Sequence, residues 1–222
     1  MKIKELLEGN EYQVIKGSDD LEIEHIACHT GKVKKNSLFI CINGRKFNGH
    51  DFIGQAINKG ATAILVQDEI TNIPEEVTLI KVANTRAIMP KIANIFFGDP
   101  TKSFNLVGIT GTNGKTSVSI MAASILEAAM HKVGVIGTIG NRIGQRVLDI
   151  EKTTPTTPDS IELGLIMKEM KREKVNDVIM EVSSMALELH RVDQCDFDIG
   201  VFTNLSQDHL DDHKTMENYK KA

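Results

Sequence analysis

Hydrophobic residues in the first hundred positions gather in short runs, which polar and glycine-containing turns separate. Runs of this length between turn residues are typical of buried strands. The predicted strands are residues 37–42, 61–66 and 78–82. Residues 51–59 have apolar side chains at helical spacing, and Gly60 follows as a residue that favours the end of a helix. This pattern predicts a small α/β unit.

One more helix is expected before the first natural linker. Asn84 can cap a helix that runs to residue 97. Pro90 would kink this helix or delay its start, because proline has no backbone N–H and crowds the preceding turn. The Gly-Asp-Pro that follows has the character of a linker, so we expect residues 1–98 to form one domain and residues 103–222 a second.

From residue 103 the pattern changes to strands that alternate with helices. Apolar runs without polar alternation are typical of parallel strands that are covered on both faces. Strands are predicted at residues 104–109, 133–138, 177–181 and 198–203, and helices at residues 115–130 and 157–172. Thr157 is the expected N-cap of the second helix, with Pro158 as its first residue. The second domain is therefore predicted to be an α/β domain with a mostly parallel sheet.

The end of the sequence carries a further expectation. Residues 215–222 start a helix that stops at the last residue, so we expect the second domain to be truncated at its C-terminus. A parallel sheet that is cut short exposes an apolar strand edge and an uncovered face. We therefore expect these 222 residues to self-associate.

The composition narrows the class of protein. The chain is 41% hydrophobic and 25% charged, which is typical of a soluble globular protein, and its formal net charge of −4 gives no electrostatic reason to expect nucleic-acid binding. No apolar run approaches the ~20 residues of a membrane span, and the start has no signal-peptide core. The three scattered cysteines read as reduced thiols. We therefore expect a cytoplasmic protein without membrane insertion.

The segment with the clearest chemistry lies between a predicted strand and a predicted helix. Its sequence is Gly111-Thr112-Asn113-Gly114-Lys115-Thr116. A glycine-rich turn at a helix N-terminus aims several backbone N–H groups at one point and can hold a phosphate there. Lys115 can reach the outer phosphates, and the Thr116 hydroxyl can bind Mg²⁺. The usual pattern has a glycine at the position of Ile109; here that glycine is Gly111. The segment predicts nucleotide binding.

Other polar residues follow predicted strands at the same edge of the sheet. Glu181 ends a strand and is a candidate Mg²⁺ ligand, with an ordinary ion pair as the alternative. Residues 208–213 follow the next strand, and one histidine among them can bind a second metal. The Thr/Pro run at residues 153–158 suits a second phosphate or a sugar, or is simply a capped loop. Ser183 and Arg191 can extend this anion site.

Taken together, these motifs resemble the Mur ligase family, and within it the MurE-type ligases. The matching segments are Thr-Gly-Thr-Asn-Gly-Lys-Thr at 110–116, Thr-Thr-Pro-Asp-Ser at 156–160, Glu-Val-Ser-Ser at 181–184 with His190-Arg191, Phe-Thr-Asn-Leu at 202–205 with Asp-His-Leu-Asp at 208–211, and Met-Glu-Asn-Tyr at 216–219. Residues 44–50, Gly-Arg-Lys-Phe-Asn-Gly-His, resemble the family's uridine-binding loop. The resemblance covers essentially the whole chain, with the motifs in the order that the family has.

The resemblance implies an ATP-dependent ligase of peptidoglycan synthesis, which adds an amino acid to UDP-N-acetylmuramoyl-L-alanyl-D-glutamate. In such ligases a substrate carboxylate attacks the γ-phosphate of ATP to give an acyl phosphate, and the amine of the amino acid then displaces phosphate to form an amide bond. The implied cofactors are ATP and Mg²⁺. The implied partners are the UDP-N-acetylmuramoyl-dipeptide and an amino acid, and the implied full-length parent is a monomer.

The resemblance also implies roles for particular residues. The catalytic residues are Lys115, Glu181 and His209, and the metal ligands are Thr116, Glu181 and His209. ATP is bound by Thr110, Gly111, Thr112, Asn113, Gly114, Lys115 and Thr116. The UDP-sugar is bound by Thr30, Arg45, Lys46, Phe47, Thr156, Thr157, Ser183 and Arg191, so the first domain is expected to bind uridine and the second ATP.

Three positions depart from the family pattern. His29-Thr30-Gly31 stands where the family has Asp-Ser-Arg, and Met185 stands where a histidine follows the two serines. The sequence stops at Ala222, before the family's lysine carbamate and third domain, so these residues alone are expected to be catalytically inactive. The alternatives are a folylpolyglutamate- or cyanophycin-type ligase and a non-catalytic UDP-sugar- or nucleotide-binding module.

Overall fold

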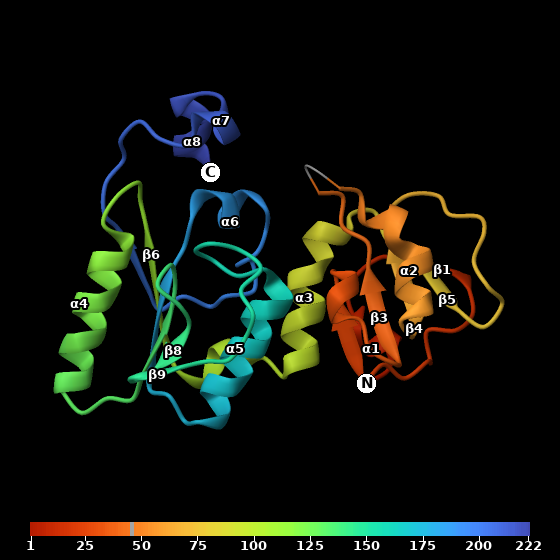
Figure 1. Cartoon of the computed structure of the whole chain (residues 1–222), viewed down its shortest axis with the longest axis horizontal. Coiled ribbons are helices and arrows are strands. Elements are labelled where there is room, and N and C mark those ends of the chain that lie inside the picture. The colour runs from red at the N-terminus through yellow and green to blue at the C-terminus, as the bar shows by residue number, and fades with distance from the viewer. Residues whose placement is uncertain (45–46) are drawn as a thin grey trace. The chain divides into compact units, whose positions relative to one another are not determined.

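The computed structural model describes residues 1–44 and 47–222, which form two compact units, Met1–Phe96 and Phe97–Ala222 (Figure 1). Arg45 and Lys46, two of the predicted uridine-loop residues, lie outside the described residues. Each unit has its own sheet and its own hydrophobic core.

The first unit is built on a sheet with the strand order β1-β5-β4-β3-β2. Its strands are β1 Gln13–Lys16, β2 His25–Ala27, β3 Ser37–Ile40, β4 Ala61–Val66 and β5 Thr78–Lys81. Strand β1 is antiparallel to β5, and the other neighbours are parallel. The three central strands agree with those predicted from the apolar runs, whereas β1 and β2 each contain only two consecutive apolar residues, Val14-Ile15 and Ile26-Ala27, and were not predicted.

The helices of the first unit cover this sheet. They are α1 Ile3–Leu6, η1 Thr30–Lys32, η2 Gly49–Phe52, α2 Ile53–Asn58 and α3 Thr85–Phe97. The side chain of Asn84 accepts hydrogen bonds from the N–H groups of Arg86 and Ala87, so the predicted cap of α3 is confirmed. Pro90 lies inside α3 without delaying its start. The apolar face around it is buried, and that burial compensates for the missing hydrogen bond.

The second unit is built on a sheet with the strand order β11-β6-β10-β7-β8-β9. Its strands are β6 Asn105–Thr110, β7 Val133–Ile136, β8 Arg142–Ile143, β9 Arg146–Val147, β10 Asp177–Glu181 and β11 Ile199–Phe202. The first four strands in this order are parallel, and β8 and β9 are antiparallel additions. The predicted α/β fold with mostly parallel sheets is therefore confirmed.

Helices pack on both faces of this second sheet (Figure 1). On the faces of the sheet lie α4 Lys115–Ala128 on one side and α5 Ser160–Arg172 and α6 Ser184–Glu188 on the other. Helices α7 Leu210–His213 and α8 Met216–Lys221 pack on each other beyond the end of the sheet, and the 3-10 turn η3 is Pro100–Ser103. Val178 and Met180 of β10 pack in the core that contains α5, whereas Ile179 packs in the core that contains α4. Because side chains alternate along a strand, Glu181 lies on the same face as Ile179 and therefore faces α4.

One predicted helix start is wrong. Helix α5 begins at Ser160, and Asp159 is its N-cap, with a carboxylate that accepts hydrogen bonds from the N–H groups of Ile161 and Glu162. Thr157 does not cap the helix because its hydroxyl is used elsewhere, as a donor to the carbonyl of Glu181. Pro158 consequently precedes the helix instead of opening it.

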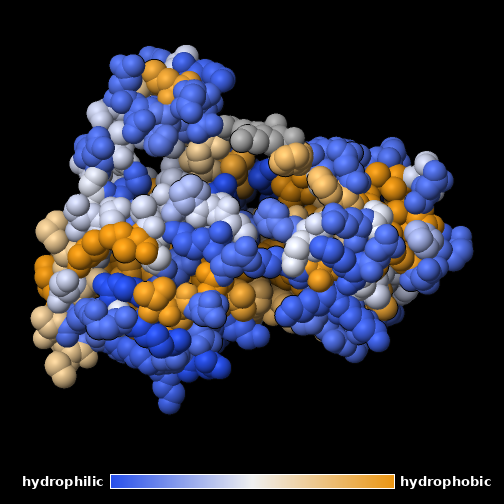
Figure 2. All heavy atoms as spheres, viewed as in Figure 1, coloured by the Kyte–Doolittle hydropathy of each residue, from blue (hydrophilic) through white to orange (hydrophobic). Residues whose placement is uncertain are grey.

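The surface of the second unit exposes apolar side chains along α4, namely Ile120, Met121 and Ile125. Figure 2 shows hydrophobic colour along the edge of the molecule where α4 lies in Figure 1. Among the helices that the structure describes, none combines the length and the apolar character needed to cross a membrane.

Candidate functional site

The glycine-rich segment forms the turn between β6 and the N-terminus of α4, as predicted. Gly111 has φ +126°, and a Cβ there would lie 2.8 Å from the carbonyl oxygen of Asn204 and still closer to the Thr203 hydroxyl. Gly114 has φ +86° and is the N-cap of α4. Both positions therefore require glycine for conformation, and Gly111 requires it for space as well. Thr110 is the last residue of β6 and leads into the turn.

Two backbone N–H groups of the turn are bound by the segment that follows β11. The N–H of Thr112 donates to the carbonyl of Asn204 at 2.9 Å, and the N–H of Asn113 donates to the Asn204 side chain at 3.1 Å. Asn204 and Thr203 in turn donate to the carbonyl of Asn113. The sequence indicated that the turn would aim its N–H groups at a ligand, but these two support the turn instead. The uncapped first turn of α4 remains as the source of N–H donors.

Lys115 folds back over the turn. Its ammonium donates to the carbonyls of Gly111 and Thr112 at 2.5 and 3.0 Å. Burial lowers the pKa of Lys115 from its ordinary value, and the nearby carboxylates of Glu181 and Asp208 oppose this effect. The Lys115 ammonium therefore lies inside the turn, close to the carboxylates of Glu181 and Asp208. A bound anion would replace the two backbone carbonyls as its hydrogen-bond acceptors.

Glu181 ends β10 with a carboxylate that points at α4, and the residue is only 2% exposed. Oε2 accepts hydrogen bonds from the hydroxyls of Thr116 at 2.8 Å and Thr138 at 2.9 Å. Oε1 accepts a hydrogen bond from the N–H of Thr138 at 3.0 Å. The structure thus brings together Thr116 and Glu181, which the sequence had paired as metal ligands. It adds Thr138, which no local motif had identified.

The threonine-rich segment at residues 153–158 lies against the end of β10. Thr157 is buried, donates to the carbonyl of Glu181 at 2.9 Å, and accepts from the N–H of Ser183 at 2.9 Å. The guanidinium of Arg191 donates to the carbonyl of Thr157 at 3.0 Å. The Thr156 hydroxyl lies 3.3 Å from that of Thr138. Four residues predicted to bind the UDP-sugar are therefore neighbours, and one of them, Thr156, lies beside Thr138, which contacts the carboxylate of Glu181.

His209 lies on a different part of the site. It precedes α7 in a left-handed conformation with φ +52°, and its side chain is 46% exposed. Its Nε2 lies 3.8 Å from Asp208, and its ring makes an edge contact with Tyr219. Within the described part of the chain, no hydrogen bond or ion pair joins His209 to Thr116 or Glu181. His209, the predicted ligand of a second metal ion, is thus close to Asp208, whose charge also acts on Lys115.

In the first unit, Phe47 is 71% exposed and makes an edge contact with Phe52, with the ring centroids 6.3 Å apart. Thr30 opens η1, and its carbonyl accepts from Lys59 at 3.0 Å. Both ring nitrogens of His50, in the 3-10 turn η2, are held in place. Its Nδ1 lies 2.6 Å from the Asn48 side chain, and its Nε2 accepts a hydrogen bond from the N–H of Gln67 at 3.2 Å. An exposed aromatic ring beside a fixed turn is suited to stacking on a planar ligand.

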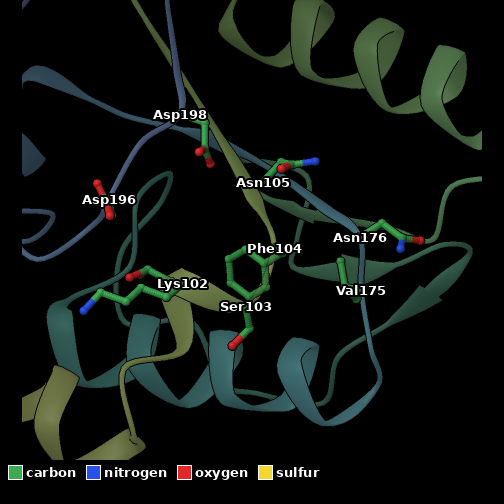
Figure 3. Close-up of a pocket in the computed structure, with 9 residues that line it drawn as sticks. Lys102, Ser103, Phe104, Asn105, Val175, Asn176, Asp196 and Asp198 are labelled. Carbon is green, nitrogen blue, oxygen red and sulfur yellow. The ribbon is translucent and has the colours of Figure 1, made fainter.

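A cavity of about 490 Å³ opens in the second unit beside the first residues of β6 and the residues before β10 (Figure 3). Its walls include Lys102, Phe104, Asn176 and Asp198. Asp198 accepts a hydrogen bond from the N–H of Leu106 at 2.7 Å, so it supports the sheet. The cavity lies at the amino ends of the strands, whereas the turn and Glu181 lie at the carboxyl ends, where parallel α/β sheets bind ligands.

Comparison with known proteins agrees with this geometry. Residues 109–222 match the Mur ligase middle domain, and residues 22–97 match the Mur ligase family, catalytic domain. A UDP-N-acetylmuramoyl-L-alanyl-D-glutamate–2,6-diaminopimelate ligase 2 of Clostridium acetobutylicum is 44% identical over 99% of this chain and 46% of the relative. The ligase of the same name (without the number) from Caldanaerobacter subterraneus subsp. tengcongensis is 48% identical over all of this chain and 45% of the relative.

Solved structures match as well. A UDP-N-acetylmuramoyl-L-alanyl-D-glutamate–2,6-diaminopimelate ligase superposes with a TM-score of 0.80 and 24% identity over all of this chain and 43% of that one. A MurF ligase from Thermotoga maritima in complex with ADP gives 0.59 and 22% over 91% of this chain and 42% of that one. At these sequence identities the structural matches show the fold alone. The chain spans less than half the length of the relatives it matches. Because the middle-domain match alone covers more than half of the 222 residues, the chain belongs to the Mur ligase family.

Proposed function

We propose that this chain is the nucleotide- and UDP-sugar-binding part of an ATP-dependent ligase, which adds an amino acid to UDP-N-acetylmuramoyl-L-alanyl-D-glutamate in peptidoglycan synthesis. The names of the relatives support the acceptor and the reaction. The observation that carries the proposal is the contact between Thr116 and Glu181 at the end of the glycine-rich turn. It places a hydroxyl and a carboxylate beside the predicted phosphate site, as phosphoryl-transfer enzymes require.

The proposed reaction begins when the substrate carboxylate attacks the γ-phosphate of ATP, which gives an acyl phosphate and ADP. The amine of the incoming amino acid then attacks the acyl carbon, and phosphate leaves as the amide bond forms. In this reaction the first turn of α4 holds the phosphates through its N–H groups. Lys115 leaves the carbonyls of Gly111 and Thr112 and donates to the transferring phosphoryl group, where its charge offsets the charge that develops.

The residues at the end of β10 fit Mg²⁺. Carboxylate and hydroxyl oxygens are the hard ligands that this cation prefers, and Glu181 and Thr116 supply one of each within 2.8 Å of one another. When bound, Mg²⁺ would neutralise charge on the phosphates. His209 and Asp208 are the proposed side chains for a second cation. Thr156, Thr157, Ser183 and Arg191 are proposed to bind the UDP-sugar, with Thr30, Arg45, Lys46 and Phe47 near the uracil.

The test is calorimetry on the 222-residue chain with two titrants, ADP with Mg²⁺ and UDP-N-acetylmuramoyl-L-alanyl-D-glutamate. We expect both to bind. Binding of the UDP-sugar alone would favour a UDP-sugar-binding module, and binding of ADP alone would favour a nucleotide-binding regulator. Binding of a folate or of a cyanophycin primer in place of the UDP-sugar would favour the folylpolyglutamate- or cyanophycin-type alternative.

A second measurement concerns turnover. These 222 residues span 44–46% of the length of the relatives, and we propose that they do not complete the reaction by themselves. Phosphate release is measured with ATP, the UDP-muramoyl-dipeptide and a mixture that contains 2,6-diaminopimelate and lysine. Sustained release above the rate without the acceptor would show that the proposed inactivity is wrong.

A further inference from the structure

Lys152 makes an unusual set of contacts for a surface lysine. Its ammonium donates to three backbone carbonyls, those of Gly137 at 2.8 Å, Thr138 at 3.1 Å and Pro155 at 2.8 Å. An ammonium has three N–H donors, so all of them are used within the chain. Lys152 is therefore saturated by its own backbone and is not disposed to bind a substrate anion. Its contacts join the turn after β7 to the threonine-rich segment at residues 153–158.

The turn after β7 is shaped around the carboxylate of Glu181. The N–H and the hydroxyl of Thr138 donate to the two carboxylate oxygens at 3.0 and 2.9 Å. A Cβ on Gly137 would lie 2.7 Å from Cδ of Glu181 and still closer to Oε1. The carboxylate thus lies directly against the Gly137-Thr138 backbone, which holds Oε2 toward the Thr116 hydroxyl. We call this arrangement of Gly137 and Thr138 the Glu181 cradle.

The other side of the Lys152 contact is the segment that carries the proposed UDP-sugar ligands. Pro155 lies directly before Thr156 and Thr157. The Thr156 hydroxyl is 3.3 Å from that of Thr138, and Thr157 donates to the carbonyl of Glu181. A single ammonium therefore spans the short gap between the backbone that orients the metal ligand and the backbone that presents the substrate-binding hydroxyls.

We propose that Lys152 is a positioning residue that fixes the Glu181 cradle and the 153–158 segment to one another, so that the cation site and the UDP-sugar site keep one mutual geometry. The inference rests on the proposed function, because it assigns roles relative to those two sites. It extends that function by naming residues, Lys152, Thr138 and Gly137, that hold the ligands without touching the reacting groups. Partners of this kind fix the orientation of metal ligands, and their loss weakens metal binding.

The test uses Lys152→Met, which keeps most of the aliphatic stem and removes the ammonium, in the 222-residue chain. Three affinities are measured: ADP without metal in EDTA, Mn²⁺ with saturating ADP by the EPR signal of free Mn²⁺, and the UDP-muramoyl-dipeptide by calorimetry. We expect about tenfold or greater weakening of Mn²⁺ binding, a clear loss of affinity for the UDP-muramoyl-dipeptide, and unchanged binding of ADP in EDTA. A general loss of structure would weaken all three together.

Lys171→Met is the matched control, since Lys171 is an exposed lysine that donates to a backbone carbonyl, that of Gly98, away from the site. It is expected to behave as the wild type. Should Lys152→Met fail to fold, Thr138→Val and Thr138→Ser test the same cradle, with Mn²⁺ binding lost in the first and restored in the second. Wild-type affinities within twofold for Lys152→Met or for Thr138→Val would overturn the inference and leave the proposed function standing. Failure of the wild type itself to bind Mn²⁺ with ADP would overturn both.

Discussion

The hydroxyl of Thr116 donates a hydrogen bond of 2.8 Å to Oε2 of Glu181, although 65 positions separate the two residues in the sequence. The contact follows from simple geometry. Strands β6 and β10 are parallel neighbours, with Glu181 in register with Ile109, so the end of β10 lies beside the start of the glycine-rich turn. Strand alternation then points the carboxylate at the face covered by α4, whose first turn carries Thr116.

Glu181→Gln is expected to weaken Mn²⁺ binding in the presence of ADP by roughly 100-fold, because it removes a charged ligand from a hard-cation site. Binding of ADP in EDTA is expected to change little or to strengthen, since a negative charge near the phosphates is removed. EPR titration of free Mn²⁺ measures the first effect and calorimetry the second. Mn²⁺ affinity equal to that of the wild type would contradict the assignment of Glu181.

Gly137→Ala tests the space next to this carboxylate. The new methyl group would collide with Glu181 and push Oε2 away from Thr116, which should weaken Mn²⁺ binding about tenfold or more. No backbone strain is expected, because Gly137 is not in the left-handed region.

Gly200→Ala is the control for Gly137→Ala. Gly200 lies in β11, and a Cβ there has open space within 4 Å. Its Mn²⁺ affinity should equal that of the wild type. Equal affinities for the two alanine variants would show that contact with Gly137 does not orient Glu181.

A pH-dependent prediction comes from His50 in the first unit. Burial lowers the pKa of His50, while the charges of Asp68 and Asp51 act in the opposite direction. The unfolded chain therefore takes up the proton first, at about pH 6.5. The contribution of His50 to stability is complete above that pH and is lost as the pH falls below it.

His50→Gln removes this titration. Urea unfolding at pH 7.5 and at pH 5 should show a smaller loss of stability between the two pH values for the variant than for the wild type. At pH 7.5 the variant should be less stable by about 1–3 kcal/mol, because the partly buried hydrogen bonds to Asn48 and Gln67 are lost or altered. An identical pH dependence in the two proteins would refute the linkage to His50.

His213 joins three parts of the second unit. Its Nε2 lies 2.8 Å from the Ser184 hydroxyl, its Nδ1 lies 3.0 Å from Glu188, and its ring stacks on Tyr219. The Tyr219 hydroxyl in turn lies 3.0 Å from that of Thr112 in the glycine-rich turn. His213→Ala should release α7 and α8 from these contacts at a cost of about 2–4 kcal/mol in the local opening free energy.

Limited trypsin digestion measures this release, because Lys214 directly follows His213. Cleavage after Lys214 should become much faster in His213→Ala. His190→Ala, which removes an exposed histidine paired with Asp193, is the control and should be cleaved at the wild-type rate. Equal cleavage rates for the two variants would show that His213 does not hold the segment.

The parts of the site that local patterns identify are those formed by neighbouring positions. The strand-turn-helix around Lys115 and the acidic end of β10 were predictable, because periodicity and glycine placement report directly on them. The support of the turn by Asn204 was not, since it joins residues 91 positions apart. Thr138 and Lys152 were missed for the same reason: a threonine after a strand and a lysine before a threonine run have no pattern of their own.

The wrong cap of α5 has a related physical cause. Thr157 and Asp159 both have side chains that favour an N-cap, and Pro158 suits the first helical position, so local preference favoured Thr157. Thr157 does not become the N-cap because its buried hydroxyl instead satisfies two backbone groups, the carbonyl of Glu181 and the N–H of Ser183. The wrongly predicted N-cap thus lies in the proposed UDP-sugar site, where tertiary contacts outweigh local helix preferences.

The exposed edge strand β11 gives the expected self-association a specific site. Strand β11 is an edge of its sheet and exposes Ile199 and Phe202, and the neighbouring face carries Ile125 of α4, which is 70% exposed. Exposed apolar edges favour pairing between copies. Light scattering should show an average mass that rises with concentration for the wild type. Ile199→Lys should shift it toward the monomer, because a charge on an edge strand opposes pairing, whereas Met130→Lys, beyond the end of α4, should not. A wild-type mass that stays monomeric at millimolar concentration would refute the expectation.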